Sequence, residues 1–302
     1  MTHILILLAV LSALGFAFCL ALLLRARKRR NRLHEAVNIY LRDGAKIDFS
    51  LHDDSWSMLE NDIAELLQLL EREKGNARAL VCENNAFLAD VSHQLKTPLA
   101  GIRLYCEMAL QPDRTDVQAC MHKQLALLER TDKLVYNLLR LEKLRTETYR
   151  MDMHDEKCED ICRSVLNNLA VLYPKKKFTL TGAAMLHCDR QWMYEAIENI
   201  VKNACEHTDE QGSVTLDISH AERSVILSVE DNGGGMDEQT RRRLFERFYR
   251  TDTAKPNSTG LGLAITRAIT ERHHGTLSAE NGTHGMKFVF CLPQTEGIKK
   301  LN

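Results

Sequence analysis

A single histidine lies near the middle of the segment FLADVSHQLKTPLAGI, residues 87 to 102. The apolar positions of this segment step by three and four, which is the spacing of a coiled-coil seam; they are Leu88, Val91, Leu95, Pro98, Ile102 and Tyr105. His93 falls between two seam positions, so we expect its imidazole to face solvent. Pro98 removes a backbone donor, and the helix should bend there. A lone surface histidine beside a kink is more often an ordinary solvated side chain, so a chemical role needs support from the rest of the chain.

Two glycine-bearing segments nearer the C-terminus could bind a nucleotide. In VEDNGGGMD, Asp231 ends a predicted strand and three glycines follow it. Such a turn lets the backbone pass close to a flat ligand while the carboxylate accepts a hydrogen bond from an exocyclic amine. In STGLGLAIT, residues 258 to 266, two glycines begin a predicted helix, where free N–H groups and the helix dipole favour phosphate. Neither segment fits the GxGxxG or GxxxxGK(S/T) pattern, which excludes the Rossmann and P-loop folds.

Two long helices should position His93. A helical pattern runs from about Met58 to about Leu110, and QPDRTD then interrupts it with a proline and polar turn residues. The second helix repeats the seam spacing at Leu127, Thr131, Leu134, Leu138 and Leu141. A hairpin with one apolar seam cannot bury that seam alone, so we expect two copies to form a four-helix bundle, and therefore a homodimer.

From residue 149 the pattern changes to that of an α+β domain with an antiparallel sheet. The sequence predicts helices over 156–173, 191–208 and 260–275, with Asp189 at or near the N-cap of the second. It predicts strands over 177–182, 184–188, 213–220, 224–231 and 286–293. The glycine-bearing segments fall at the ends of these elements, where a ligand could reach them.

The N-terminus predicts a membrane helix. Ile4 to Leu24 is an uncharged apolar run of 21 residues, about 31 Å long as a helix. Six Arg or Lys follow it between positions 25 and 32, which is the reverse of the charge order in a signal peptide. The positive-inside rule therefore predicts a single pass with the N-terminus outside and the rest cytosolic. Only Met1 to His3 would protrude, so we expect no external sensor domain.

The composition of the whole chain limits its function. A length of 302 residues allows roughly two domains, and the net charge of -1 gives no sign of nucleic-acid binding. Nine cysteines without a spacing pattern indicate reduced thiols rather than a disulfide framework. We predict a transmembrane helix and basic flank at 1–31, a juxtamembrane linker at 32–76, a helical hairpin at 77–148 and an α+β domain at 149–302. The linker is HAMP-like at best, because it lacks the usual proline.

Taken in order, the motifs resemble those of membrane sensor histidine kinases. HQLKTPL resembles the H box, ENIVKNACEHT the N box, EDNGGGM the first glycine box, RLFERFYR the F box and STGLGLAI the second glycine box. NGTHGMKFVFCLP resembles the closing strand, and the likeness covers about residues 80 to 294. The resemblance implies a HisKA-type dimerisation domain followed by an ATP-binding α+β sandwich of the GHKL (Bergerat) fold.

The resemblance also implies roles for single residues. His93 would accept the γ-phosphoryl group of ATP, and Asn203 would bind Mg²⁺, with Asn199 on the same helical face. Asp231 would read the adenine amine. The other implied nucleotide-binding residues are His207, Gly233, Gly235, Arg250, Lys255, Gly260, Leu261 and Gly262. Phe245 and Phe248 would pack beneath the nucleotide lid rather than touch the ligand.

Several residues depart from the family pattern. Gln94 stands where the family commonly has an acid, and it can orient the imidazole only through an amide oxygen. Glu206 stands where a basic residue often faces the phosphates, and Ser258 replaces a glycine. Thr97 lies one turn after His93, on the same helical face, where it could position water for dephosphorylation of the partner. The implied partner is a separate response regulator, and the signal would be sensed in the bilayer, in the cytosol or through a membrane partner protein.

Two other functions remain open on these residues. A non-kinase ATPase of the same fold, such as a chaperone or a DNA-strand-passage protein, would lack an H box and a membrane anchor. A binding-only pseudokinase would regulate its partner by docking; Asn203, Asp231 and both glycine boxes argue against it, whereas Gln94 is compatible with it. Incubation with labelled ATP separates the three, because only a histidine kinase acquires acid-labile, base-stable phosphate.

Overall fold

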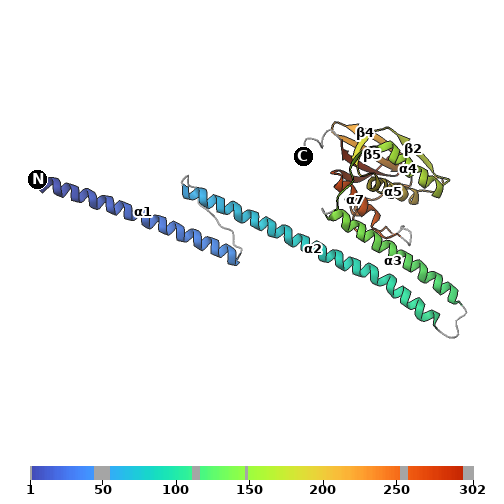
Figure 1. Ribbon diagram of the computed structural model, residues 1–302, viewed down its shortest axis with the longest axis horizontal. Helices are drawn as coiled ribbons and strands as arrows, with labels where there is room; N and C mark the ends of the chain where they lie inside the picture. Colours follow the sequence, from blue (N-terminus) through green and yellow to red (C-terminus); the bar gives the residue numbers. More distant parts are fainter. Residues whose placement is uncertain (1, 44–54, 111–115, 147–148, 252–257, 295–302) are drawn as a thin grey trace. The chain divides into compact units, whose positions relative to one another are not determined.

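The computed structural model describes residues 2–43, 55–110, 116–146, 149–251 and 258–294. The chain divides into two compact units, Met1–Ala89 and Asp90–Asn302. In the first unit, helix α1 spans Thr2–Asp43 (Figure 1). It therefore includes the apolar run, the basic flank and the first part of the segment predicted as a linker. The rest of that linker up to residue 54 lies outside the described residues.

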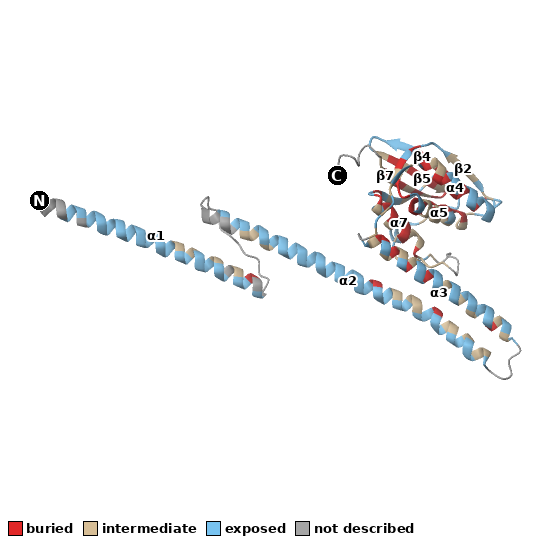
Figure 2. Cartoon of the chain, in the orientation of Figure 1, coloured by how far each residue is buried: buried red, intermediate tan, exposed pale blue. Residues whose placement is uncertain are grey.

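Helix α1 is long and apolar enough to cross a membrane. Its candidate span is Ile6–Tyr40, with a mean hydropathy of 2.7 in the most apolar window and none of that window buried in the chain. The described apolar side chains between Ile6 and Leu24 are exposed, as Figure 2 shows along the helix. The length, the apolar composition and this exposure favour a membrane-spanning helix over the core helix of a soluble protein.

The helical hairpin is formed by α2, Ser55–Ala109, and α3, Val117–Arg145. Asp116 begins α3 as its N-cap, because its carboxylate accepts a hydrogen bond from the backbone N–H of Ala119. α2 continues through Pro98, which is buried. Thus the proline lies inside the helix and does not end it. Of the predicted seam of α3, Leu134, Leu138 and Leu141 are buried in a single chain.

Residues 154–251 and 258–293 form a two-layer α+β sandwich. Its five-stranded sheet has the order β2-β4-β5-β7-β6, and the strands are β2 Lys177–Thr181, β4 Ser213–Ala221, β5 Ser224–Asp231, β6 Thr276–Asn281 and β7 Met286–Pro293. Helices α4 (Cys158–Leu172), α5 (Arg190–Glu206) and α7 (Gly262–Arg272) contact this sheet. Alternate strand residues are buried, for example Met286, Phe288, Phe290 and Leu292 of β7. One face of the sheet therefore supplies the core (Figure 2).

The sheet differs from the sequence prediction in one respect. It is mixed rather than antiparallel, because β2 pairs with β4 in parallel while the other neighbours are antiparallel. The chain runs from β2 to β4 through β3 and the helix α5, and a helical crossover of this kind is what parallel pairing of two strands requires. The sequence prediction also missed the short strand β1, His154–Lys157, which pairs with β3, Met185–Cys188. It missed β6 and the short helix α6, Glu238–Arg243.

The N-terminus of α5 is fixed as predicted. Asp189 is its N-cap, and Oδ1 accepts hydrogen bonds from the backbone N–H groups of Gln191 and Trp192. One face of α5 is buried in the core by Met193, Ile197 and Ile200, among others. The opposite face is left to line a cavity, and this face carries the residues of the predicted N box.

Candidate functional site

The predicted phosphoacceptor lies on an exposed face of α2. His93 is exposed, as the seam pattern predicts, and Gln94 beside it is half-buried. The hydroxyl of Thr97 donates a hydrogen bond to the carbonyl of His93 at 3.3 Å. Pro98 has no N–H to donate to the carbonyl one turn before it, which is that of Gln94. The imidazole is therefore accessible on a helix segment with reduced backbone hydrogen bonding.

The helical register places His93 opposite the C-terminal half of α3. The side chain of Gln124 donates to the sulfur of Cys106 at 3.0 Å, and Leu127 packs over Gly101. Both helices rise 1.5 Å per residue and run in opposite directions. Extending the two contacts along the hairpin therefore puts about positions 135 to 137 of α3 opposite His93. Asn137, at this level, donates a hydrogen bond from Nδ2 to Oγ1 of Thr259 in the second glycine segment, at 3.2 Å.

Asp231 lies in a cavity of about 330 Å³ at the end of β5. Its side chain is buried, and Oδ1 accepts backbone N–H bonds from Gly233 at 2.9 Å and Met286 at 3.2 Å. Among the described residues no donor is recorded for Oδ2, which leaves that oxygen for a ligand amine. Burial raises the pKa of Asp231, while the two backbone donors and His207 oppose the shift.

Glycines allow the backbone to approach this carboxylate closely. A Cβ at Gly233 would lie 2.1 Å from the carbonyl oxygen of His207, and one at Gly285 would lie 2.4 Å from Oδ1 of Asp231. A Cβ at Gly235 would lie 2.9 Å from the side-chain oxygen of Asn281. Any side chain at the first two positions would collide with the backbone or with the carboxylate, so the cavity depends on their being glycine. The sequence prediction named Gly233 and Gly235 but missed Gly285.

A second cavity, of about 450 Å³, adjoins the first through five shared residues. One face of α5 and the residues that follow it line this cavity with Asn199, Asn203, Glu206 and His207. Arg250, Gly260 and Gly262 line it from the other side. Gly260 has a φ of +69° and lies against the backbone of Phe248, where a Cβ would come within 2.7 Å. Only glycine adopts this turn without strain.

Among the described residues that were predicted to bind the nucleotide, Leu261 lines neither cavity. Leu261 has no exposed surface, and it is part of the core between the two glycines. Its side chain therefore supports the turn, and the predicted contact with a nucleotide would be made by its backbone. Lys255 lies outside the described residues. Phe245 packs edge-on against Phe288 with ring centroids 6.4 Å apart, in agreement with its predicted packing role.

Several cavity residues were not identified from the sequence. Lys202 precedes Asn203 and follows Asn199 by three positions, so the helical period could have revealed it. Met236, Thr251, Met286 and Phe288 line the cavity around Asp231. Lys133 and Asn137 line the second cavity from α3, and no local pattern points from that helix to the glycine segments. This connection depends on tertiary packing.

Comparisons with known proteins identify two domains. Residues 83–147 match the family described as His Kinase A (phospho-acceptor) domain, and residues 188–296 match the family described as Histidine kinase-, DNA gyrase B-, and HSP90-like ATPase. The first match includes His93, and the second includes both glycine segments. Each family match therefore covers a part of the chain that contains candidate functional residues.

Curated relatives are similar to the chain over most of its length. Sensor histidine kinase YclK of Bacillus subtilis is 28% identical over 287 residues, which cover 89% of this chain and 59% of the relative. Sensor histidine kinase TrcS of Mycobacterium tuberculosis is 31% identical over 224 residues, covering 70% of this chain and 44% of the relative. The chain spans about half the length of the curated relatives it matches.

A solved structure shares its fold with most of this chain. The histidine kinase ThkA, in its complex with the response regulator protein TrrA, has a TM-score of 0.57 at 22% identity, covering 77% of this chain and 68% of that one. At this identity the likeness concerns the fold. The phosphoacceptor and ATPase domain matches in this order, together with the sensor kinase relatives, show that this chain belongs to the sensor histidine kinase family.

Proposed function

We propose that this protein transfers the γ-phosphoryl group of ATP to His93 and then to an aspartate of a separate response regulator. The observation that carries the proposal is the hydrogen bond between Asn137 and Thr259. This hydrogen bond connects the second glycine segment to α3. The contact lies at the point along the hairpin where the helical register puts His93 on the opposite helix. An accessible imidazole and a nucleotide cavity thus occur at one level of the same hairpin.

The adenine would bind at Asp231. Oδ2 would accept a hydrogen bond from the exocyclic amine, because Oδ1 already accepts two backbone bonds. The phosphates would extend into the second cavity, toward Asn203 and the glycines at 260 and 262. A neutral imidazole nitrogen of His93 would attack the γ-phosphorus, the bond from that phosphorus to the bridging oxygen would break, and ADP would leave.

The side chains in the second cavity fit a magnesium ion. Asn203 would hold it through its amide oxygen, and Asn199 one turn earlier could assist. No cluster of three His, Cys, Asp or Glu suited to a metal occurs among the described residues. Such a sparse protein site suits Mg²⁺, which takes its remaining ligands from water and substrate phosphates. When bound, the ion neutralises phosphate charge.

The location and partners follow from the same proposal. Helix α1 would anchor the chain in a membrane in a single pass, with the N-terminus outside and the catalytic region cytoplasmic. The protein would act as a dimer, and a membrane partner protein would be one source of its signal. The chain would also remove phosphate from its response regulator, with Thr97 positioning water and Gln94 assisting weakly.

Labelling with γ-³²P-ATP tests the proposal. The wild-type chain should acquire acid-labile, base-stable phosphate, and His93→Ala should acquire none while still binding ATP. Asn203→Ala should also lose labelling, because it lacks the amide oxygen proposed for the metal. Labelling of the His93 variant at the wild-type level would exclude His93, and an unlabelled wild-type chain that binds ATP would indicate a pseudokinase.

A further inference from the structure

The wall of the second cavity includes side chains from outside the catalytic domain. Lys133 and Asn137, one turn apart on α3, line it together with Asn199, Asn203 and Gly262. The hydrogen bond from Asn137 to Thr259, at 3.2 Å, connects this helix to the residue just before Gly260. The helical hairpin therefore forms part of the space in which the proposed function places the phosphates.

Lys133 brings a positive charge to this wall. Its side chain is exposed, and it forms no ion pair within the described part of the chain. Lys202 and Arg250 line the same cavity, whereas Glu206 is its acidic residue. An ammonium group on a flexible stem is a common phosphate ligand in proteins. The charge of Lys133 can offset Glu206, which stands where a basic residue would otherwise face the phosphates.

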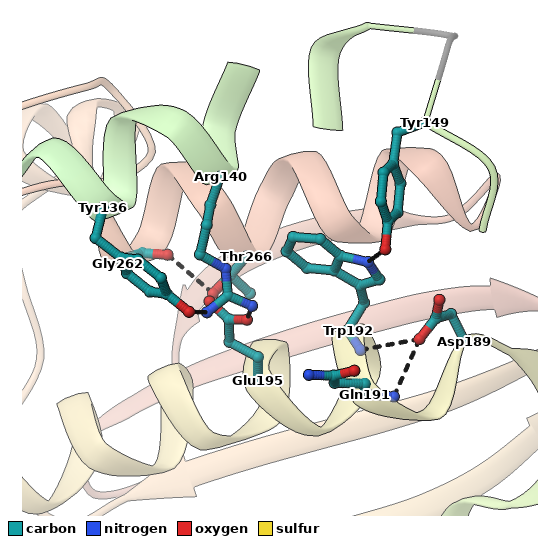
Figure 3. A network of polar contacts seen from close by, with 9 residues as sticks. All are labelled: Tyr136, Arg140, Tyr149, Asp189, Gln191, Trp192, Glu195, Gly262 and Thr266. Atoms are coloured by element: carbon teal, nitrogen blue, oxygen red, sulfur yellow. Dashed lines mark hydrogen bonds and ion pairs between the residues drawn. The ribbon is translucent and has the colours of Figure 1, made fainter. Parts of the chain in front are cut away.

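A second cluster holds α3 against the catalytic domain. Arg140, two turns after Lys133, forms an ion pair with Glu195 of α5 (Figure 3). The guanidinium carbon lies 4.6 Å from the ring centroid of Trp192 and 5.2 Å from that of Tyr136. The side chains of Arg140 and Glu195 are only 20% and 15% exposed. Because a partly buried ion pair is costly to separate into single charges, this contact fixes where α3 lies along α5.

We propose that Lys133 of α3 is a phosphate-binding residue for the nucleotide, and that the Arg140–Glu195 pair is the anchor that positions it. The inference rests on the proposed function and adds a ligand that comes from the hairpin. It implies that Lys133 increases the affinity for nucleotides whose phosphates it can reach, and that it does not affect the affinity for adenosine. It also implies that α3 must be docked for this binding to occur.

Affinities of the full chain for three ligands test the proposal: adenosine, ADP and the non-hydrolysable ATP analogue AMP-PNP, all with Mg²⁺. Lys133→Ala should weaken AMP-PNP binding about 3- to 10-fold, since one charge-assisted contact is lost. It should weaken ADP binding less and leave adenosine unchanged. Lys143→Ala is the matched control, because Lys143 is exposed on the same helix and lines neither cavity. It should bind all three ligands like the wild type.

The outcomes separate this inference from the proposed function. If Lys133→Ala binds AMP-PNP as tightly as Lys143→Ala does, or loses adenosine affinity equally, Lys133 is not a phosphate ligand. If the wild type binds no adenine nucleotide, the proposed function fails instead. Arg140→Ala should reproduce the loss for AMP-PNP, and adding Lys133→Ala to it should produce no further loss. Fully additive losses would show that Arg140 does not position Lys133.

Discussion

Asp231 shows how a single residue can be placed for binding at a cost to stability. Its carboxylate is buried, and this burial raises its pKa. A raised pKa means that the folded chain holds the proton more tightly than the unfolded chain does. The contribution of Asp231 to stability is therefore complete below its unfolded pKa and is lost as the pH rises through the folded pKa. At neutral pH the ionised group opposes folding, a cost that the proposed binding of adenine would account for.

Replacing Asp231 by Asn should separate these two effects. The amide oxygen can still accept from Gly233 and Met286, whereas the amide nitrogen would face the adenine amine as a second donor. We expect ATP affinity to fall about 10- to 100-fold, while the melting temperature without nucleotide at pH 7 stays equal or rises. Calorimetric titration and thermal denaturation measure the two quantities. Unchanged affinity would mean that adenine binds elsewhere.

Thr97 should affect dephosphorylation of the response regulator and not autophosphorylation. Its hydroxyl donates to the carbonyl of His93, so its oxygen lone pairs remain able to accept from a water molecule. We expect Thr97→Ala to slow the loss of phosphate from the phosphorylated regulator about 10-fold or more, while Thr97→Ser retains activity. Labelling of His93 should persist in both. If Thr97→Ala dephosphorylates the regulator at the wild-type rate, its hydroxyl serves the helix alone.

At the scale of the elements, a buried histidine joins the start of α5 to the end of α7. Nε2 of His273 accepts from the backbone N–H of Asp189 at 3.0 Å, and Nδ1 donates to the carbonyl of Ile269 at 2.7 Å. This pattern requires the neutral imidazole. Burial lowers the pKa of His273, with smaller opposing effects from the Ile269 carbonyl and Asp189.

The pH dependence of stability tests this link. Because the folded pKa of His273 is lowered, its contribution is present above the unfolded value of about 6.5 and is lost as the pH falls. We expect the wild-type melting temperature to decrease between pH 7.5 and 5.5 by several degrees more than that of His273→Gln. His274→Gln, which changes the exposed neighbour, should retain the wild-type dependence. Equal slopes in all three proteins would contradict the assignment.

The elements that the sequence predicts well are those with a strong local signal. The seam periodicity predicts α2 and α3, the N-cap at Asp189 predicts α5, and alternation predicts β4, β5 and β7. The strand β6, TLSAEN, lacks apolar alternation, and β1 consists of four polar residues that pair only because β3 lies beside them. The glycines and Asp231 stand in local sequence motifs, so the sequence alone made them candidates. Lys133 stands in no such motif and lines the cavity only through tertiary packing.

For the whole molecule, the burial of the predicted seam changes which residues should contact a second copy. Leu134, Leu138 and Leu141 are already buried in one chain. A different set of apolar residues on α3 remains exposed and follows steps of three, four and seven: Met121, Leu125, Leu128, Val135 and Leu139. Stripes of this kind are unstable in water and are commonly covered by a partner helix.

Charges on this exposed stripe should produce monomers. We expect Leu125→Glu combined with Leu128→Glu to halve the mass of the detergent-solubilised protein in analytical ultracentrifugation, because two carboxylates would be buried at the interface. Ala126→Glu, at an exposed position of the same helix that the helical period places on a different face from the stripe, serves as the control and should remain dimeric. A dimer that survives the double substitution would show that other residues hold the copies together.

The hydrogen bond between Asn137 and Thr259 has a consequence for which cellular conditions could regulate this protein. If docking of α3 makes nucleotide binding more favourable by some free energy, then a bound nucleotide makes docking of α3 more favourable by the same free energy, because linkage between two equilibria is reciprocal. ATP and ADP differ by one phosphate, so they would stabilise the docked position of α3 by different free energies. The hairpin would then respond to the ratio of the two nucleotides, and the energy state of the cell would be an input alongside any signal from the membrane.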